Sequence, residues 1–343
     1  MEYKRILVKG VNWVGDAIFI TPALSALRSG FPKAKISLLV PENLAEIYEG
    51  NPNIDELIVY GRGGRLKEKI KLIRTLREKK FNLGIIMQST SYEPAILFYL
   101  ARIPERVGYS HSLRNLLLTK VVKRSKKTQH EVDFFLGLVK ALGVEITRKE
   151  VFMAEDGEAK EWARNFLIKS SYGKDDLLVG IFPGAYFGPA KRWFPKRYAT
   201  LADSLIKSYR ARVILFGGKN DLPLIQKIID KMTANPINAV GKTSLKQLRA
   251  LIEKCRLFIT NDSGPLQVAS TTKTPIVALF GSSDPEKTRP WRKEDCTIIY
   301  KKVSCSPCFR RKCKKLICFK EISAEDVFQA AKTYLNRECQ SNQ

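Results

Sequence analysis

The sequence predicts an α/β protein with two doubly wound parallel sheets. The chain has 343 residues, 44% of them apolar; this content is ordinary for a globular protein, but the length exceeds the usual size of one core, so two domains are expected. Short apolar runs alternate with helical patterns in both halves, and those of the second half stop at turns that carry glycine. Such alternation of buried strands and helices is typical of parallel sheets.

In the first half, four apolar runs are predicted strands and the patterns between them are predicted helices. The predicted strands are residues 5–9, 35–40, 56–60 and 83–87, and the predicted helices are residues 16–28, 42–49 and 66–79. Two more amphipathic helices are predicted at 130–142 and 155–169, before the polar, turn-prone stretch 170–176. We place the linker in this stretch, so the predicted N-terminal domain covers residues 1–170.

The second half repeats this plan, and its predicted domain covers residues 171–322. The predicted strands are residues 177–182, 212–216, 257–260 and 276–280. The glycine-bearing turns after them gather backbone N–H groups at the carboxyl edge of one sheet, which suits a nucleotide. Two such domains facing across a cleft would form a small-molecule site between them. The last predicted helix, within residues 323–343, could pack on either domain.

The excess of basic residues favours anionic partners. Lys and Arg number 60 against 34 Asp and Glu, a formal net charge of +26, which attracts nucleotides, nucleic acids and anionic lipid alike. Basic residues are dense at 120–127 and at 301–320, where eight occur without an acid. No apolar run reaches the ~18–20 residues of a membrane-spanning helix, and the N-terminus lacks a signal-peptide pattern. The expected location is therefore the cytoplasm or the cytoplasmic face of a membrane.

Asp16 is a candidate catalytic base. It ends the loop that follows the first predicted strand, and it lies in the first turn of the next predicted helix. A carboxylate there can cap the helix, which is worth about 1 kcal/mol. It can also face the cleft as a general base, which contributes ~10²–10⁴-fold to a rate. The local pattern favours the cap and leaves the catalytic role open.

A loop with flexible backbone and two cations follows the first strand of the second half. It contains Gly184, Ala185, Lys191 and Arg192, just before a helix opened by Pro195. Strand, glycines and cations in this order predict phosphate binding. A lysine here would neutralise the charge that grows on a diphosphate leaving group. The alternative is a loop with incidental surface charge.

Two later turns carry acids beside small residues. In Asp262-Ser263-Gly264, the amides and the serine could hold a phosphate while the carboxylate orients hydroxyl groups. Asp262 could instead be an ordinary N-cap. Asp221, which follows a Gly-Gly turn, is placed to accept hydrogen bonds from ribose hydroxyls. These turns extend the predicted nucleotide site.

Four of the seven cysteines are clustered near the C-terminus. The spacing of Cys305, Cys308, Cys313 and Cys318 can hold a structural zinc or iron, although zinc sites more often have two tight Cys-x2-Cys pairs. Reduced cysteines without a metal are the alternative, because disulfides are not expected in the cytoplasm. The chain has two histidines, which excludes a histidine-rich metal centre.

Together, three motifs resemble the ADP-heptose:lipopolysaccharide heptosyltransferases of glycosyltransferase family 9. They are Asn12-Trp13-Val14-Gly15-Asp16, Pro183-Gly184-Ala185 with Gly188-Pro189-Ala190-Lys191-Arg192-Trp193, and Asn261-Asp262-Ser263-Gly264. The resemblance spans nearly the whole chain and is closest to the type II enzymes. It implies a GT-B fold, with the acceptor bound by the N-terminal half and ADP-heptose by the C-terminal half. It also implies that the last helix crosses back to the first domain.

The resemblance implies roles for individual residues. Asp16 would be the base of an inverting transfer that needs no cofactor. The implied donor-binding residues are Gly184, Ala185, Lys191, Arg192, Asp221, Asp262, Ser263, Gly264 and Gln267. The implied acceptor-side residues are Asn12, Trp13, Ser89, Arg106, Arg114 and His130. Gln267 stands where the family often has histidine, and glutamine can donate a hydrogen bond to phosphate but cannot become cationic.

We therefore predict transfer of heptose from ADP-heptose to the heptose of the lipopolysaccharide inner core. No divalent ion is expected, because the sequence has no Asp-x-Asp pair to hold one. The acceptor is anchored by lipid A, so the basic clusters would serve peripheral contact with the inner membrane.

Three alternatives remain open to test. Another family 9 transferase would use a different donor or acceptor. A nucleic-acid binder with a cysteine knuckle would leave the four glycine-bearing turns unexplained, so nucleic acid is not an expected partner. A sugar-nucleotide epimerase would need a dinucleotide glycine fingerprint that the first loop lacks.

Overall fold

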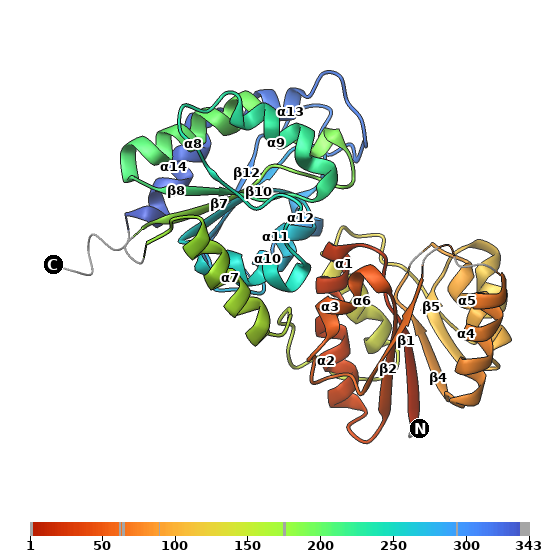
Figure 1. The fold of residues 1–343 in the computed structure, drawn as a ribbon. Helices are drawn as coiled ribbons and strands as arrows, with labels where there is room; N and C mark the ends of the chain where they lie inside the picture. The colour runs from red at the N-terminus through yellow and green to blue at the C-terminus, as the bar shows by residue number, and fades with distance from the viewer. Residues whose placement is uncertain are drawn as a thin grey trace. The chain divides into compact units, whose positions relative to one another are not determined.

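The computed structural model describes residues 3–61, 63, 66–88, 90–173, 176–292 and 294–336. The chain divides into two compact units, Met1–Ala154 and Glu155–Gln343 (Figure 1). Helix α7 (Gly157–Lys169) belongs to the second unit, where it packs on α10 (Leu245–Lys254). The sequence places the domain boundary after this helix, at residue 170.

The first unit contains a parallel sheet of six strands. Its strands are β1 (Arg5–Lys9), β2 (Lys35–Pro41), β3 (Glu56–Tyr60), β4 (Leu83–Ile86), β5 (Glu105–Tyr109) and β6 (Lys120–Val122), in the order β3-β2-β1-β4-β5-β6. Its helices are α1 (Val14–Phe19), α2 (Thr21–Gly30), η1 (Glu42–Leu44), α3 (Ala45–Tyr48), α4 (Leu66–Glu78), α5 (Glu93–Leu100), η2 (Ser112–Leu117) and α6 (Glu131–Lys140). The predicted helix 16–28 is two helices, because Pro22 opens α2 and cannot continue the hydrogen bonding of α1.

The second unit contains a second parallel sheet of six strands. Its strands are β7 (Leu178–Phe182), β8 (Arg212–Leu215), β9 (Ile237–Asn238), β10 (Leu257–Asn261), β11 (Ile276–Phe280) and β12 (Cys296–Tyr300), in the order β12-β11-β10-β7-β8-β9. Besides α7 and α10, its helices are η3 (Pro189–Lys191), α8 (Pro195–Tyr209), η4 (Lys219–Asp221), α9 (Leu222–Ile229), α11 (Gly264–Ala269), α12 (Pro285–Thr288), α13 (Ile317–Lys320) and α14 (Ala324–Leu335).

Both sheets have the same strand order, counted along each unit. In each, the first and fourth strands are neighbours and the connections leave in opposite directions from them. This topological switch point lies between β1 and β4 in the first unit and between β7 and β10 in the second. In doubly wound folds, ligands bind outside the carboxyl ends of the strands at this point. The topology therefore gives each unit one expected binding edge.

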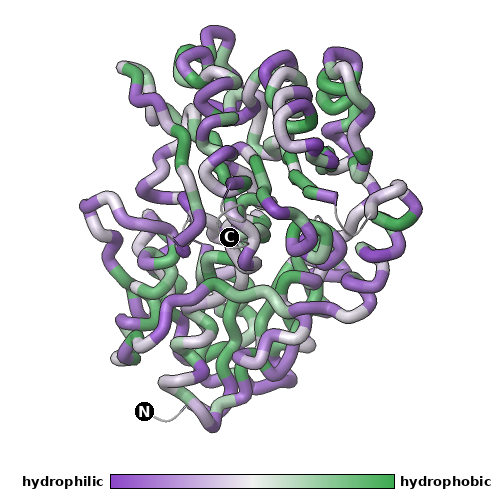
Figure 2. The backbone as a smooth tube through the Cα atoms, turned by 90° about the vertical axis from the view of Figure 1, so that its left-hand side faces the viewer, coloured by the Kyte–Doolittle hydropathy of each residue, from purple (hydrophilic) through white to green (hydrophobic). Residues whose placement is uncertain are grey.

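The central strands of the second sheet are buried along their whole length and carry its core. All five residues of β7, β10 and β11 are buried. Figure 2 shows hydrophobic stretches in green alternating with hydrophilic stretches in purple along the backbone. In the second unit, α14 packs on α8, and Val327 and Ala331 belong to the core. The described part of residues 323–343 therefore contributes to the second unit.

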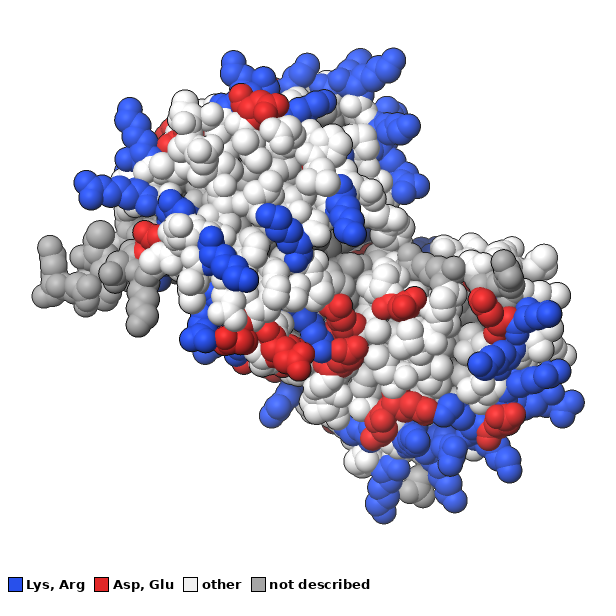
Figure 3. All heavy atoms as spheres, viewed as in Figure 1, with Lys and Arg blue, Asp and Glu red and all other residues white. Residues whose placement is uncertain are grey.

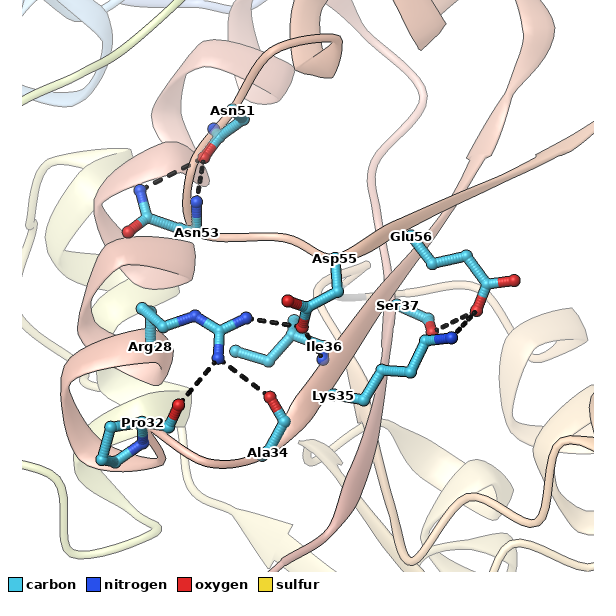
Figure 4. A network of polar contacts seen from close by, with 10 residues as sticks. All are labelled: Arg28, Pro32, Ala34, Lys35, Ile36, Ser37, Asn51, Asn53, Asp55 and Glu56. Atoms are coloured by element: carbon cyan, nitrogen blue, oxygen red, sulfur yellow. Dashed lines mark hydrogen bonds and ion pairs between the residues drawn. The ribbon is translucent and has the colours of Figure 1, made fainter.

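A polar network joins α2 to two strands of the first unit (Figure 4). Arg28 donates to the Asp55 carboxylate at 2.6 Å and to the carbonyl of Ala34 at 2.9 Å. The same carboxylate accepts from the backbone N–H of Ile36 at 2.7 Å. Burial raises the pKa of Asp55, but the hydrogen bonds from Ile36 and Arg28 outweigh it, so the net pKa is lowered.

The surface carries the basic excess of the sequence. Figure 3 shows Lys and Arg side chains spread over both units on the face in view, with groups of acidic side chains among them. None of the helices in the described parts of the chain is long and apolar enough to cross a membrane.

Candidate active site

The loops at the second switch point meet through an ion pair. Lys191, in the loop after β7, donates to the carboxylate of Asp262, directly after β10, at 2.5 Å. The two side chains are 16% and 6% exposed. The pair is largely shielded from water, so removing either partner would leave an uncompensated buried charge and destabilise the fold. The sequence identifies both residues, and the fold joins them.

The next cation pairs on the other side of β7. Arg192 donates to Asp221 at 3.1 Å, and Asp221 also accepts from the backbone N–H of Gly218 at 3.1 Å. Gly184 lies against this carboxylate, since a Cβ there would be 2.6 Å from Asp221 Oδ2. Ala185, next to it, is buried. The turn after β7 thus needs glycine to pack on the acid after β8.

Asn261, at the end of β10, fixes the two central loops. Its amide donates to the carbonyl of Pro183 at 2.7 Å, and its oxygen accepts from the hydroxyl of Tyr198 at 2.9 Å. Ser263 follows at the N-cap of α11 with extended backbone, and Gly264 is the first residue of that helix. The Ser263 hydroxyl lies 3.4 Å from that of Thr260. These contacts hold the predicted phosphate-binding turn at the switch point.

Several buried polar atoms at this edge have no hydrogen-bond partner among the described residues. Gln267 is 2% exposed, and its amide donates to the carbonyl of Thr288 at 2.7 Å while its Oε1 has no partner. The hydroxyls of Ser282 and Ser283, in the turn after β11, and Nε of Arg192 are likewise unpaired. Unpaired buried groups are costly. These atoms are therefore available to hydrogen-bond a molecule bound at this edge.

Asp16 lies at the switch point of the first unit. Trp13 occupies the N-cap position of α1, and Asp16 is half-buried in its first turn. The phenol of Tyr48 is fully buried close by, and its hydroxyl has no partner in the described chain. Burial, and secondly the charge of Asp16, raise the pKa of Tyr48 well above its usual range. A carboxylate beside a neutral phenol suits proton transfer from a substrate hydroxyl.

Sequence reasoning missed Lys9 at this edge. Lys9 ends β1, is 4% exposed, donates to the carbonyl of Gly10 at 2.9 Å and lies 4.9 Å from the ring centre of Tyr60. Gln88, after β4, donates to the same carbonyl at 3.1 Å. The available signal was a lysine that ends the predicted strand 5–9, directly after the apolar run Ile6-Leu7-Val8.

The implied acceptor-side residues have different environments. Asn12 and Trp13 are exposed beside Asp16. Arg114 is fully buried and donates to the carbonyls of Gln88 at 2.9 Å and Ser91 at 3.1 Å, and to that of Tyr109. It thus ties the loop after β4 to the end of β5.

Two of the remaining acceptor-side residues make structural contacts. Arg106 lies near the start of β5, away from the carboxyl edge, and donates to the carbonyl of Leu117 at 2.7 Å. His130 is buried and caps α6, its Nδ1 accepting from Val132 at 3.1 Å. Ser89 lies outside the described residues.

The four clustered cysteines lie in and after the segment that follows β12. Burial raises the pKa of Cys318, and the charges of Cys305, Cys308 and Cys313 raise it further. A hydrogen bond from the backbone N–H of Leu316 lowers the pKa of Cys313. No group of three or more His, Cys, Asp or Glu side chains in the described ranges is arranged to hold a metal ion. The zinc or iron suggested by the spacing is therefore unsupported.

Two doubly wound sheets, with a cationic edge on the second, fit the GT-B class of glycosyltransferases. The model of glycosyltransferase family 9 (heptosyltransferase) matches residues 69–317. The chain belongs to this family. The predictions of an α/β GT-B fold, of a glycosyltransferase and of this family are thereby confirmed.

Relatives agree over most of the chain. Lipopolysaccharide heptosyltransferase 2 of Escherichia coli K12 is 31% identical over 303 residues, covering 83% of this chain and 85% of the relative. The crystal structure of a family 9 glycosyl transferase from Veillonella parvula has a TM-score of 0.88 and 31% identity and covers 98% of each chain. The structure of E. coli ADP-heptose lipopolysaccharide heptosyltransferase II has a TM-score of 0.81 and 27% identity, covering 97% of this chain and 99% of the other.

Proposed function

We propose that the protein transfers heptose from ADP-heptose to a heptose of the lipopolysaccharide inner core, as a type II heptosyltransferase. The observation that carries this proposal is the ion pair of Lys191 and Asp262 at the second switch point, where doubly wound folds bind nucleotide phosphates. The name of the E. coli relative, lipopolysaccharide heptosyltransferase 2, supports heptose as the sugar and lipopolysaccharide as the acceptor.

The second unit holds the donor in this proposal. The ammonium of Lys191 has three N–H donors, so it can contact diphosphate oxygens while it stays near Asp262. Asp221, in the loop after β8, accepts from ribose hydroxyls, and its ion pair with Arg192 orients it. The backbone at Ser263 and Gly264 and the buried amide of Gln267 contact the donor from the β10 side.

Asp16 acts as the base in the chemical step. It takes the proton of an acceptor hydroxyl, whose oxygen forms a bond to the anomeric carbon of the donor. The bond from that carbon to the diphosphate oxygen breaks, and ADP leaves with the electron pair. Attack opposite the leaving group inverts the anomeric centre. Lys191 and backbone N–H groups stabilise the charge on ADP, so the step requires no divalent ion.

The first unit receives the acceptor. Asn12 and Trp13 contact it directly, because both are exposed beside Asp16. Arg114 and His130 act through the loops and helix that they hold. The acceptor is anchored by lipid A, so the protein works at the cytoplasmic face of the inner membrane as a peripheral protein.

A second candidate is another family 9 transfer with a different donor or acceptor. Gln267 supports this second candidate. It is a buried donor-side residue, and the resemblance leads one to expect a histidine at its position. The two candidates differ in the substrates that support turnover.

The test is release of ADP from ADP-heptose, with and without a heptose-terminated core acceptor, in the presence of a chelator. The proposal predicts acceptor-dependent release that survives chelation and is faster than with other sugar nucleotides. Release only with another donor or acceptor would support the second candidate. Loss of release on chelation, restored by a divalent ion, would contradict metal-independent transfer.

A further inference from the structure

The surface formed by α5 and η2 exposes large apolar side chains in register. We call this the α5–η2 surface and define it by Ile96, Tyr99, Leu100, Leu113 and Leu116, which are 46%, 55%, 42%, 71% and 81% exposed. The first three recur at helical spacing on α5, and the last two are three residues apart on the 3-10 helix η2, so each set shares one face. Contiguous exposed apolar patches mark interaction sites.

The two elements pack against each other, and contacts with the rest of the first unit fix their positions. Helix α5 packs on η2. The guanidinium of Arg106 lies 5.6 Å from the ring centre of Tyr99 and donates to the carbonyl of Leu117 at 2.7 Å. The opposite side of α5 is buried through Ala95 and Phe98. The exposed residues are therefore held on a rigid platform.

A basic segment follows η2 in the chain. From residue 106 to residue 130 the sequence has no Asp or Glu. The segment directly after η2 exposes five basic side chains, Lys120, Lys123, Arg124, Lys126 and Lys127. An apolar platform beside cations, with no acid in the segment, complements an anionic lipid surface. Most protein partners would present charges of both signs.

We propose that the α5–η2 surface docks the protein on an anionic membrane. The apolar side chains enter the headgroup boundary, and the cations of residues 120–127 contact lipid phosphates. Binding at such an interface strengthens with the apolar area buried and with electrostatic attraction to anionic lipid. This proposal rests on the proposed function in one respect only, since a lipid-anchored acceptor is what makes membrane docking useful.

The test is sedimentation of the full chain with vesicles, comparing phosphatidylcholine alone with a mixture that contains phosphatidylglycerol. The variant is L113D/L116D, and the control is I168D, at an apolar residue of α7 that is 62% exposed. We expect wild type and I168D to bind the anionic vesicles and L113D/L116D to bind at least about tenfold less. All three should melt at similar temperatures, because the substituted side chains are exposed.

Turnover separates this proposal from the proposed function. We expect the double variant to match wild type on a soluble, delipidated acceptor and to fall behind on the same acceptor in anionic vesicles. Equal vesicle binding by the double variant and I168D would overturn the docking surface, as would wild-type binding that ignores lipid charge. Loss of wild-type turnover on the soluble acceptor would instead contradict the proposed function, while the vesicle result would still stand.

A second inference concerns the segment 301–316, which we call the cysteine segment. Its backbone N–H groups at Cys308 and Phe309 donate to the carbonyl of Ser282, in the turn after β11, at 3.0 and 2.8 Å. The carbonyl of Arg311 accepts from the N–H of Ala190 at 3.2 Å. The cysteine segment thus joins the loop after β11 to the loop that carries Lys191.

Arg311 and Lys191 share one aromatic ring. The Nε–H of Arg311 donates to the carbonyl of Phe187 at 3.0 Å, and its guanidinium carbon lies 5.3 Å from the centre of the Phe187 ring. The ammonium of Lys191 lies 5.2 Å from the same centre. A cation at this distance is attracted to the face of an aromatic ring. The ring therefore limits where Lys191 can point, and Arg311 holds the ring.

The geometry points to Arg311 as a positioning residue for Lys191. The test compares R311A with R310A, which removes the neighbouring exposed arginine, and with R311K. We expect R311A to lower kcat/KM for the donor about tenfold with an unchanged KM for the acceptor and an unchanged melting temperature. R311K should recover only part of the loss, since it keeps the charge but not the Nε–H. Equal donor kinetics in R311A and R310A would overturn the assignment, as would equal losses for both substrates.

Discussion

Lys191 and Arg192 are adjacent in sequence but pair with acids on opposite sides of β7. Asp262 follows β10, the neighbour of β7 on one side, and Asp221 follows β8, its neighbour on the other. The two cations are therefore held on either side of the carboxyl end of β7. A diphosphate needs such a divided positive field, because its charge is spread over several oxygens.

Replacing Lys191 by methionine should separate the effect of its charge on turnover from its effect on stability. We expect turnover to fall about 10²-fold, because one preorganised donor to the leaving group is lost. The single variant should also melt lower, since Asp262 is left buried without its partner. K191M/D262N should recover the melting temperature but not the turnover. Recovery of turnover in the double variant would contradict the assigned role.

Gly188 offers a second prediction at this scale. Its φ is +156°, and a Cβ there would lie 2.3 Å from the carbonyl oxygen of Arg311. G188A should therefore move the loop of Lys191 and lower kcat/KM for the donor by tenfold or more. G157A, at a glycine with no atom within 4 Å of its added Cβ, is the control, and kinetics equal to that control would contradict the argument.

Much of the candidate site follows from local sequence, but its pairings do not. Asp16, Lys191, Asp221 and Asp262 stand out because each follows a predicted strand at a turn with small residues. Their partners depend on strand order, which local patterns do not contain. Lys9, Tyr48 and Arg311 were missed for the same reason. Their neighbours come from distant segments, and a single lysine, tyrosine or arginine in sequence is most often a core or surface residue.

At the level of elements, the predicted strands of the apolar runs agree with β1 to β4, β7, β8, β10 and β11 to within a few residues. The prediction omitted α5, α10, β5, β6, β9 and β12. The helix α5 is apolar on both faces, so it lacks a clear amphipathic period, and β9 has only two residues. The exposed half of α5 is what the membrane proposal explains.

The network of Asp55 predicts a pH dependence of stability. The pKa of Asp55 is lower in the folded chain than in the unfolded chain, where an aspartate has a pKa of about 4. Its carboxylate therefore stabilises the fold fully above about pH 4, and this stabilisation is lost as the pH falls through the lower pKa of the folded state. D55N should melt lower than wild type at pH 7, and the difference should shrink below about pH 4. D230N, at an exposed carboxylate, should show little difference. A gap that does not depend on pH would contradict this account.

At the scale of the whole molecule, a charge of +26 acts over distances that salt can screen. The Debye length shortens from about 14 to 4 Å between 0.05 and 0.5 M salt. We expect turnover on vesicle-borne acceptor to fall several-fold over this range, and turnover on a soluble acceptor to fall less. Parallel losses on both acceptors would show that salt acts on the active site and not on docking.

The central claim is that Asp16 is the base of a glycosyl transfer, and ADP release with a heptose-terminated acceptor tests it most directly. The comparison is D16N against D133N, the same change at a surface ion pair of the first unit. We predict that D16N loses at least about 10²-fold in turnover while it binds ADP-heptose like wild type, and that D133N keeps its activity. Turnover by D16N equal to that of D133N would contradict the claim and leave Asp16 a structural residue of α1.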